Sequence, residues 1–270
     1  MGLAMSFLES IRSLFYGGTL NSGPLKEGRL LDVPSASNYR DLGGYETPHG
    51  PTAYRRFVRA GSTERLSESD MVRLEDYGVR CVLDLRSSAE APRQTCRFAR
   101  RNAISWENVP LFDYDLSDPA LMAHGIPAGN YLIDGYVTMT SNRVAIRRIF
   151  EFFAAAPTDG GVLFHCAAGM DRTGITAMLL LGLADVSREQ IVADYLYSFA
   201  PQDEVDAVVF EGERPWEHEF GWNPLPARKE AVEFVLDGIE HGYGTTRAYL
   251  ETCGIDGVCL DRVRGMLLGL

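Results

Sequence analysis

The sequence predicts an α/β fold in which a central, mostly parallel sheet is flanked by helices. Short, strongly apolar segments of strand length alternate along the chain with longer segments of helical periodicity. The chain has 270 residues, of which 46% are apolar and 23% charged, so a sizeable core can form and global disorder is excluded. No internal repeat is visible, which leaves a layered domain as the simplest architecture.

Residues 1–29 are expected to form an N-terminal amphipathic helix followed by a linker. Apolar side chains recur there at helical spacing, at Leu3, Phe7, Ile11, Leu14 and Phe15. A secretory signal is disfavoured because Glu9 interrupts the apolar stretch and no basic region precedes it, and Gly2 with Ser6 fits only the loose N-myristoylation pattern. We expect this helix to cover the core or to contact a second copy of the chain, so a homo-oligomer formed through it is a candidate assembly.

Residues 30–270 are expected to form one domain of alternating elements. Ser67 and Ser187 are candidate N-caps, and Gln190 follows the second of them at capping-box spacing. Residues 201–226 are irregular and acidic. The expected strands cover 79–85, about 104–111 and 161–165, and the expected helices cover 67–77, 130–156, 171–183, 187–199, 227–241, 245–252 and 258–269.

Composition narrows the range of partners. The formal charge is −11, so broad attraction to nucleic acid or to anionic lipid is not expected. No apolar run reaches the roughly 18 residues of a membrane-spanning helix, which argues against stable membrane insertion. Five cysteines at no metal-like spacing indicate neither a disulfide framework nor a metal site, and they favour a reducing, cytoplasmic location.

The segment HCAAGMDRTG, residues 165–174, joins a buried strand to a helix and carries the chemistry. Amides of a tight turn and of a helix N-terminus point inward there and form a cup for a phosphate dianion. The helix dipole and these amides favour the thiolate form of Cys166 at the base of the cup. Gly169 permits backbone angles or a close approach that a Cβ would forbid.

Two further side chains complete the expected phosphate site. Arg172, six residues after the cysteine, can fold over the loop and bind two phosphate oxygens in a bidentate manner. Thr173 can place its hydroxyl near the sulfur and stabilise the thiolate as a leaving group. His165 is expected to orient the loop by hydrogen bonding.

These residues match the Cys-x5-Arg signature, and the chain resembles the cysteine-dependent tyrosine phosphatases. Within that superfamily it is similar to the bacterial and fungal tyrosine-phosphatase-like family, which includes secreted lipid and protein phosphatases. The resemblance covers roughly residues 30–270. It is carried by NYRDLGGY (38–45), YRRFVRAG (54–61), VLDLRSSAE (82–90), HCAAGMDRTG (165–174), IVADY (191–195) and the tail 243–267.

The resemblance implies a strand, phosphate loop and helix at the active site, and hydrolysis of a phosphate monoester in two displacements without a metal or other cofactor. Cys166 is the implied nucleophile, and Arg172 and the loop amides hold the phosphate oxygens. In the family the aspartate before the arginine, here Asp171, is the candidate that protonates the leaving oxygen. The alternative for Asp171 is a helix N-terminal charge that the dipole stabilises. Other members of the superfamily use an upstream aspartate, for which Asp113, Asp115 and Asp134 are the candidates.

The candidate substrate-binding residues come from the loop and from matching upstream positions. Asp84 should lie near Cys166, because ligands in open α/β sheets sit outside the carboxyl ends of strands. A structural ion-pair network that fastens loops is the alternative for the upstream residues, which also include Asp41 and Arg86. The candidates are Ala167, Ala168, Gly169 and Met170 in the loop, with Asp84, Arg59 and Arg40 upstream.

One position departs from the family, which usually has lysine where this chain has Met170. A lysine there suits polyanionic substrates such as phosphoinositides, whereas methionine offers a flexible apolar contact. Phosphotyrosine or a small phosphorylated metabolite is therefore favoured over a phosphoinositide.

Several alternatives stay open at this stage. A protein tyrosine phosphatase is the leading hypothesis; a small-molecule phosphatase with the same loop and a non-catalytic phosphate-binding module are the others. Cys81 is either a core thiol or a partner for a protective disulfide with Cys166. Trp216, His218 and Trp222 either form a lid over the substrate or anchor their own loop.

Overall fold

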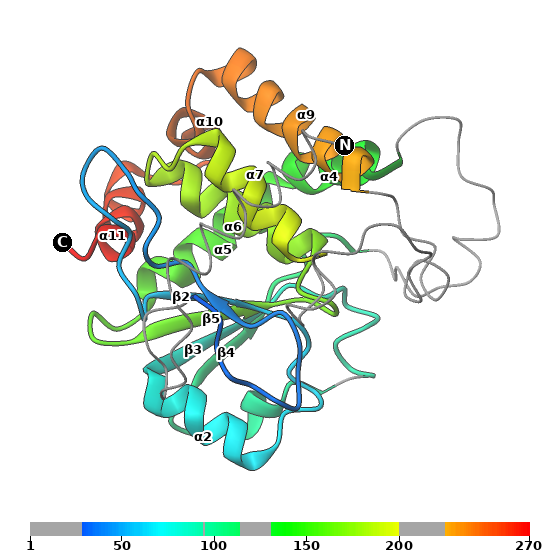
Figure 1. Cartoon of the computed structure of the whole chain (residues 1–270), viewed down its shortest axis with the longest axis vertical. Helices are drawn as coiled ribbons and strands as arrows, with labels where there is room; N and C mark the ends of the chain where they lie inside the picture. The colour runs from blue at the N-terminus through cyan, green and yellow to red at the C-terminus, as the bar shows by residue number, and fades with distance from the viewer. Residues whose placement is uncertain (1–28, 94, 114–130, 200–224) are drawn as a thin grey trace, which may run out of the picture.

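The computed structural model describes residues 29–93, 95–113, 131–199 and 225–270, and its centre is a five-stranded sheet (Figure 1). The strand order is β1-β2-β5-β3-β4; β1 is antiparallel to β2, and the other neighbours are parallel. The predicted α/β class with a mostly parallel sheet is confirmed. The strands are β1 (Arg40–Asp41), β2 (Phe57–Ala60), β3 (Val79–Asp84), β4 (Ser105–Asn108) and β5 (Gly161–His165).

Helices cover both faces of the sheet, and one face receives most of them (Figure 1). The helix α2 and the short 3-10 helix η1 lie on one face, and the other helices of the described residues form the layer on the opposite face. The helices are α2 (Glu68–Tyr77), η1 (Arg97–Arg100), α4 (Tyr131–Ser141), α5 (Arg143–Ala155), α6 (Asp171–Leu183), α7 (Arg188–Tyr197), α9 (Leu225–Tyr243), α10 (Thr246–Thr252) and α11 (Gly257–Leu268).

Alternation along the buried strands divides the core in two. In β5, Val162 and Phe164 point into the larger core against the helical layer, whereas Leu163 points into the smaller core under α2. Because both faces of β5 are buried, its sequence is continuously apolar up to His165, as parallel central strands require. The loop that follows therefore begins at the edge where the parallel strands end.

One predicted helix is two helices. The helical pattern over 130–156 is interrupted at Asn142, whose ψ of 69° leaves the helical region. Its side chain accepts a hydrogen bond from the Ala145 amide at 3.2 Å and so caps a new helix, α5. The capping predictions for Ser67 and Ser187 are confirmed, and Ser67 forms a full capping box with Asp70.

Several expectations fall outside the described residues. They include the helix and nearly all of the linker in 1–29, the candidate acid Asp115 and the aromatic cluster of Trp216, His218 and Trp222. Among the described helices, none combines the length and the apolar character that crossing a membrane requires.

Candidate active site

Cys166 sits immediately after β5, at the base of the loop that leads into α6. Its side chain is almost fully buried, at 3% exposure. The Gly169 amide donates a hydrogen bond to the Cys166 Sγ at 3.3 Å. At least one loop amide therefore points into the cup that the sequence predicted, directly at the sulfur.

Four consecutive carbonyls of this loop are tied to groups outside it. Because a carbonyl and the following amide point to opposite sides of a peptide plane, holding the carbonyls outward favours amides that face inward. The donors are the His165 ring for the Cys166 carbonyl (3.1 Å), the Ser62 amide for Ala167 (2.9 Å), the Asn38 side chain for Ala168 (3.1 Å) and Gly169 (2.9 Å), and Arg59 for Gly169 (3.0 Å).

Gly169 is required by both conformation and space. Its φ of 73° lies in the left-handed region, and a Cβ there would come within 2.6 Å of the Gly61 nitrogen and 2.7 Å of the Ala60 carbonyl. The loop passes this close to the end of β2 because Ser62 binds it there. A side chain at position 169 would push the loop away from the sheet.

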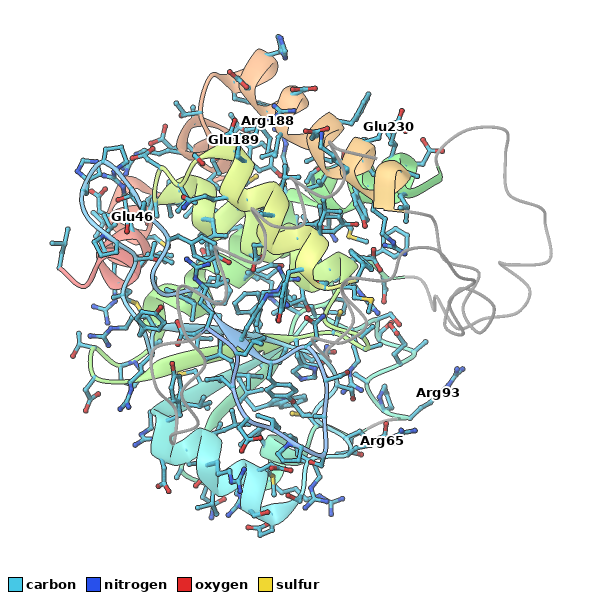
Figure 2. All side chains as sticks on the ribbon, in the orientation of Figure 1. Glu46, Arg65, Arg93, Arg188, Glu189 and Glu230 are labelled. Carbon is cyan, nitrogen blue, oxygen red and sulfur yellow. The ribbon has the colours of Figure 1, made fainter. Side chains whose placement is uncertain are left out.

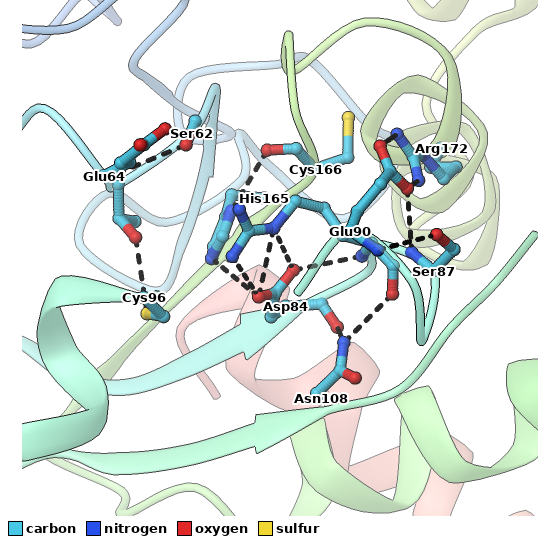
Figure 3. A network of polar contacts seen from close by, with 12 residues as sticks. Ser62, Glu64, Asp84, Ser87, Glu90, Cys96, Asn108, His165, Cys166 and Arg172 are labelled. Carbon is cyan, nitrogen blue, oxygen red and sulfur yellow. Dashed lines mark hydrogen bonds and ion pairs between the residues drawn. The ribbon is translucent and has the colours of Figure 1, made fainter. Parts of the chain in front are cut away.

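Arg172 lies in the first turn of α6 and is bound by a carboxylate (Figure 3). The two terminal nitrogens of its guanidinium bind the two carboxylate oxygens of Glu90, one of them at 3.0 Å. Burial disfavours the charged form, but Glu90 and the nearby Cys166 outweigh it and raise the pKa of Arg172. Within the described residues Arg172 Nε is a buried donor that has no acceptor, so it is available to an anion in the cup.

The comparisons with known proteins agree with this geometry. Residues 31–269 match the tyrosine phosphatase family. The chain belongs to that family. It is 30% identical over 211 residues to a tyrosine-protein phosphatase of Nostoc commune, and the aligned region covers 74% of this chain and 69% of the relative. It is 27% identical over 281 residues to the triple specificity protein phosphatase PtpB of Mycobacterium tuberculosis, and this alignment covers 89% of this chain and 99% of the relative. As a member of the family, it is a phosphoric monoester hydrolase.

In this tyrosine phosphatase, Arg40 and Arg59 lie beneath the loop and have no exposed surface. Both bind the carboxylate of Asp194 on α7, Arg40 through Nε at 2.9 Å. Burial opposes ionisation of Asp194, but the two guanidinium groups lower its pKa to about 2. With no exposed surface, Arg40 and Arg59 fit the ion-pair alternative, and Arg59 also donates to the Gly169 carbonyl; that they border the substrate stays a prediction.

Asp84 is also fully buried at the end of β3, and its carboxylate binds the Arg86 side chain in a bidentate manner, at 2.6 Å and 2.9 Å (Figure 3). His165 lies beside this pair, 3.9 Å from the Asp84 carboxylate, and burial lowers its pKa. The prediction that Asp84 lies near Cys166 agrees with the register, which pairs Asp84 with His165. Because Asp84 is fully buried, it has no exposed surface in this structure with which to contact a substrate.

The candidate acids differ in their surroundings. Asp171 opens α6 next to Arg172, and its side chain is 24% exposed. Asp113 is exposed and accepts hydrogen bonds from the Ser88 amide and hydroxyl at 2.9 Å and 2.7 Å. Asp134 is exposed on α4. Of the three, Asp171 lies beside the cup, because it follows the loop directly and precedes Arg172 in the chain.

The remaining loop residues lie around the entrance. Ala167 is exposed, Ala168 is half-buried, and Met170 is half-buried and packs against the larger core. Thr173 is fully buried, and its hydroxyl has no partner within the described residues. The contact of Met170 with the core leaves only part of its side chain for a substrate.

The proposed disulfide between Cys81 and Cys166 does not fit the sheet. Cys81 lies opposite Val162, four residues before Cys166 on the neighbouring strand, which corresponds to about 13 Å along extended chain. A disulfide requires Cα atoms within about 7 Å. Burial raises the pKa of the Cys81 thiol, so Cys81 is a core thiol.

Sequence reasoning missed Glu90, Asp194 and Asn38 as residues of the site. Each stands inside a segment that carried the resemblance, in VLDLRSSAE, IVADY and NYRDLGGY, but nothing local identified its partner. Charge alone did not help, because other charged residues, such as Arg65 and Glu189 labelled in Figure 2, are exposed. For Glu90 and Asp194, an acidic residue within a matched segment was the signal available.

Proposed function

We propose that this phosphatase hydrolyses phosphotyrosine in proteins without a metal, through a phosphocysteine intermediate at Cys166. The observation that carries the proposal is the Gly169 amide directed at the Cys166 sulfur, with Arg172 in the adjacent turn. Amides and a guanidinium provide the positive field that the phosphoryl oxygens need in transfer. A buried anionic nucleophile is stabilised by the same groups.

In the first displacement, the Cys166 thiolate attacks phosphorus in line with the ester oxygen. The sulfur–phosphorus bond forms as the bond to the ester oxygen breaks, and the leaving phenolate oxygen takes a proton from the Asp171 carboxyl. Arg172 and the loop amides bind the three equatorial oxygens throughout. The products of this step are the free tyrosine and phosphocysteine.

In the second displacement, water attacks the phosphorus of phosphocysteine. The Asp171 carboxylate accepts a proton from that water, and the sulfur–phosphorus bond breaks to return the thiolate and release inorganic phosphate. We assign to Thr173, whose buried hydroxyl has no partner within the described residues, a hydrogen bond to the departing sulfur. Protons and charges are therefore restored after one turnover.

The test uses the purified chain, an aryl phosphate and a chelator. We expect full activity in the presence of the chelator, and we expect Cys166→Ser to abolish turnover while still binding inorganic phosphate. A serine hydroxyl keeps the shape of the cup but is a far weaker nucleophile than a thiolate. Chelator-sensitive hydrolysis, or activity that survives the substitution, contradicts the mechanism.

The substrate class is tested separately with phosphopeptides, phosphoinositides, nucleotides and sugar phosphates. Met170 in place of the lysine that the resembled family usually carries supports phosphotyrosine over polyanionic lipids. A preference for a phosphorylated metabolite would instead support the alternative, a small-molecule phosphatase. Binding of phosphate with no turnover of any substrate would support a phosphate-binding module.

A cytoplasmic location is also proposed. All five cysteines of the chain lie in the described residues and are free thiols. Fractionation of the producing cells checks this location.

A further inference from the structure

Asp171 meets side chains from helices that are distant in sequence. Its carboxylate oxygen Oδ1 accepts a hydrogen bond from the Tyr136 hydroxyl of α4 at 2.5 Å. The same oxygen accepts one from Nη1 of Arg228, on α9, at 3.3 Å. Both contacts approach the oxygen from the helical layer.

A second tyrosine lies beside these two donors. The hydroxyl of Tyr195, on α7, is hydrogen-bonded to the Tyr136 hydroxyl, and the charge of the nearby Arg228 acts on Tyr195. The two tyrosine rings meet edge to face, with centroids 6.0 Å apart. Arg228 is 5% exposed in its side chain and lies over the Phe199 ring, 3.8 Å from its centroid.

The direction of each hydrogen bond follows from the number of available protons. Tyr136 has one hydroxyl proton and gives it to the carboxylate, so its oxygen accepts the proton of the Tyr195 hydroxyl. Burial and the charge of Asp171 raise the pKa of both tyrosines, which keeps both hydroxyls protonated. The chain of bonds therefore ends on Asp171 Oδ1.

The two oxygens of Asp171 are consequently different. Both described donors bind Oδ1, and no described residue donates to Oδ2. The side chain retains 24% exposure, so Oδ2 is the oxygen with room to carry the acid proton and meet a substrate. A carboxyl fixed through one oxygen presents the other at a defined angle, as proton transfer in a transition state requires.

We propose that Tyr136, Tyr195 and Arg228 are positioning residues that hold the Asp171 carboxyl through Oδ1 and thereby direct Oδ2 at the leaving oxygen of the substrate. This inference rests on the proposed role of Asp171 as the general acid. It adds that helices α4, α7 and α9 set the geometry of an acid that belongs to α6.

The test compares two substrates that need the acid to different degrees. A nitrophenyl phosphate has a leaving group that departs without a proton, whereas a phosphotyrosine peptide needs one. We expect Tyr136→Phe, which removes only a hydroxyl, to lower kcat/KM for the peptide by about 10-fold and for the nitrophenyl ester by less than about 2-fold. Asp171→Asn should show the same selectivity with a loss of about 100-fold for the peptide.

A double-mutant cycle separates positioning from a general structural effect. In the Asp171→Asn background, Tyr136→Phe should cause no further loss, because the group that it positions is gone. Tyr249→Phe is the matched control: it also removes a buried hydroxyl bonded to α4, but its 2.6 Å bond goes to the Thr140 carbonyl. Arg228→Gln provides the same test from α9 if Tyr136→Phe does not fold.

Three results would overturn the inference. Equal losses for both substrates in Tyr136→Phe and Arg228→Gln would assign these residues to structure alone, as would losses that add fully to that of Asp171→Asn. If Asp171→Asn itself shows no selectivity between substrates, Asp171 is not the acid and the inference fails with that role. The nucleophile is judged independently by Cys166→Ser.

Discussion

At the scale of single residues, Gly169 decides the shape of the phosphate loop. It combines a left-handed backbone with contacts to β2 that leave no space for a Cβ, and its amide is the one directed at Cys166 Sγ. Conformation and chemistry therefore depend on the same peptide. A change here should affect phosphate binding before it affects the core.

Gly169→Ala is predicted to lower phosphate affinity at least about 10-fold and to destabilise the chain by about 1–2 kcal/mol, the typical cost of a left-handed alanine. The measurements are inhibition by inorganic phosphate and chemical denaturation. Gly238→Ala is the control, because a Cβ on this helical glycine of α9 would meet no atom within 4 Å, and the change should gain about 0.5–1 kcal/mol. Unchanged phosphate inhibition in Gly169→Ala would show that the loop tolerates a different shape.

A second prediction concerns substrate specificity at Met170. Met170→Lys adds a cation at the start of α6, beside the cup, and should raise turnover of phosphoinositides relative to phosphotyrosine peptides. The measurement is the ratio of kcat/KM for the two substrates in both proteins. A ratio that does not change would mean that position 170 does not face the substrate.

At the scale of elements, the loop is held by a buried ion cluster between the sheet and α7. Arg40 of β1 and Arg59 of β2 share the carboxylate of Asp194, and Arg59 also donates to the Gly169 carbonyl. Two cations on one anion leave net positive charge directly beneath the phosphate loop. The cluster thus fastens α7 to the sheet and also favours anions above it.

Asp194→Asn is predicted to lower the free energy of unfolding by about 3–5 kcal/mol, because it leaves two buried guanidinium groups without their counter-charge. Urea denaturation measures the change. Asp237→Asn is the control, since it removes an exposed partner of Arg188 and should cost at most about 1 kcal/mol. A loss of similar size in both variants would contradict the role of the cluster.

At the scale of the whole molecule, buried ionised groups make stability depend on pH. Hydrogen bonds and cations outweigh burial and lower the pKa of Asp84, Glu90 and Asp194, the last to about 2. A lowered carboxyl pKa contributes stability above the unfolded value, near 4, and loses it as pH falls toward the folded value. Asp41 acts in the opposite direction, because burial raises its pKa to about 6 and stability falls as pH rises from about 4 to 6.

The free energy of unfolding is therefore predicted to rise steeply between pH 2 and pH 4, with about 2 kcal/mol from Asp194 alone. Between pH 4 and pH 6 the curve should be flatter, since Asp41 opposes the stabilising effect of keeping the buried His165 neutral. Urea denaturation at a series of pH values measures this curve. A constant stability below pH 4 would contradict ionised carboxylates in the buried pairs.

Local patterns predicted most of the elements and the phosphate loop. Strand, loop and helix around Cys166 are adjacent in the chain, so periodicity and the glycine were enough to place them. The break at Asn142 was missed because the apolar periodicity continues through it, and the cap became evident only from the backbone. The roles of Arg40, Arg59 and Asp84 stayed open between substrate contact and ion pair, and their burial favours the ion pair.

The sequence by itself determined the α/β class, the phosphate loop and the place of its proposed nucleophile, because these depend on residues within a few positions of one another. Only the tertiary structure decided which acidic groups the arginines bind and what holds Asp171. Glu90 is 82 residues from Arg172, and Arg228 is 57 residues from Asp171. Among 26 cationic side chains, only two of them lysine, no local pattern selects these partners, since a buried ion pair forms wherever packing excludes water from both charges.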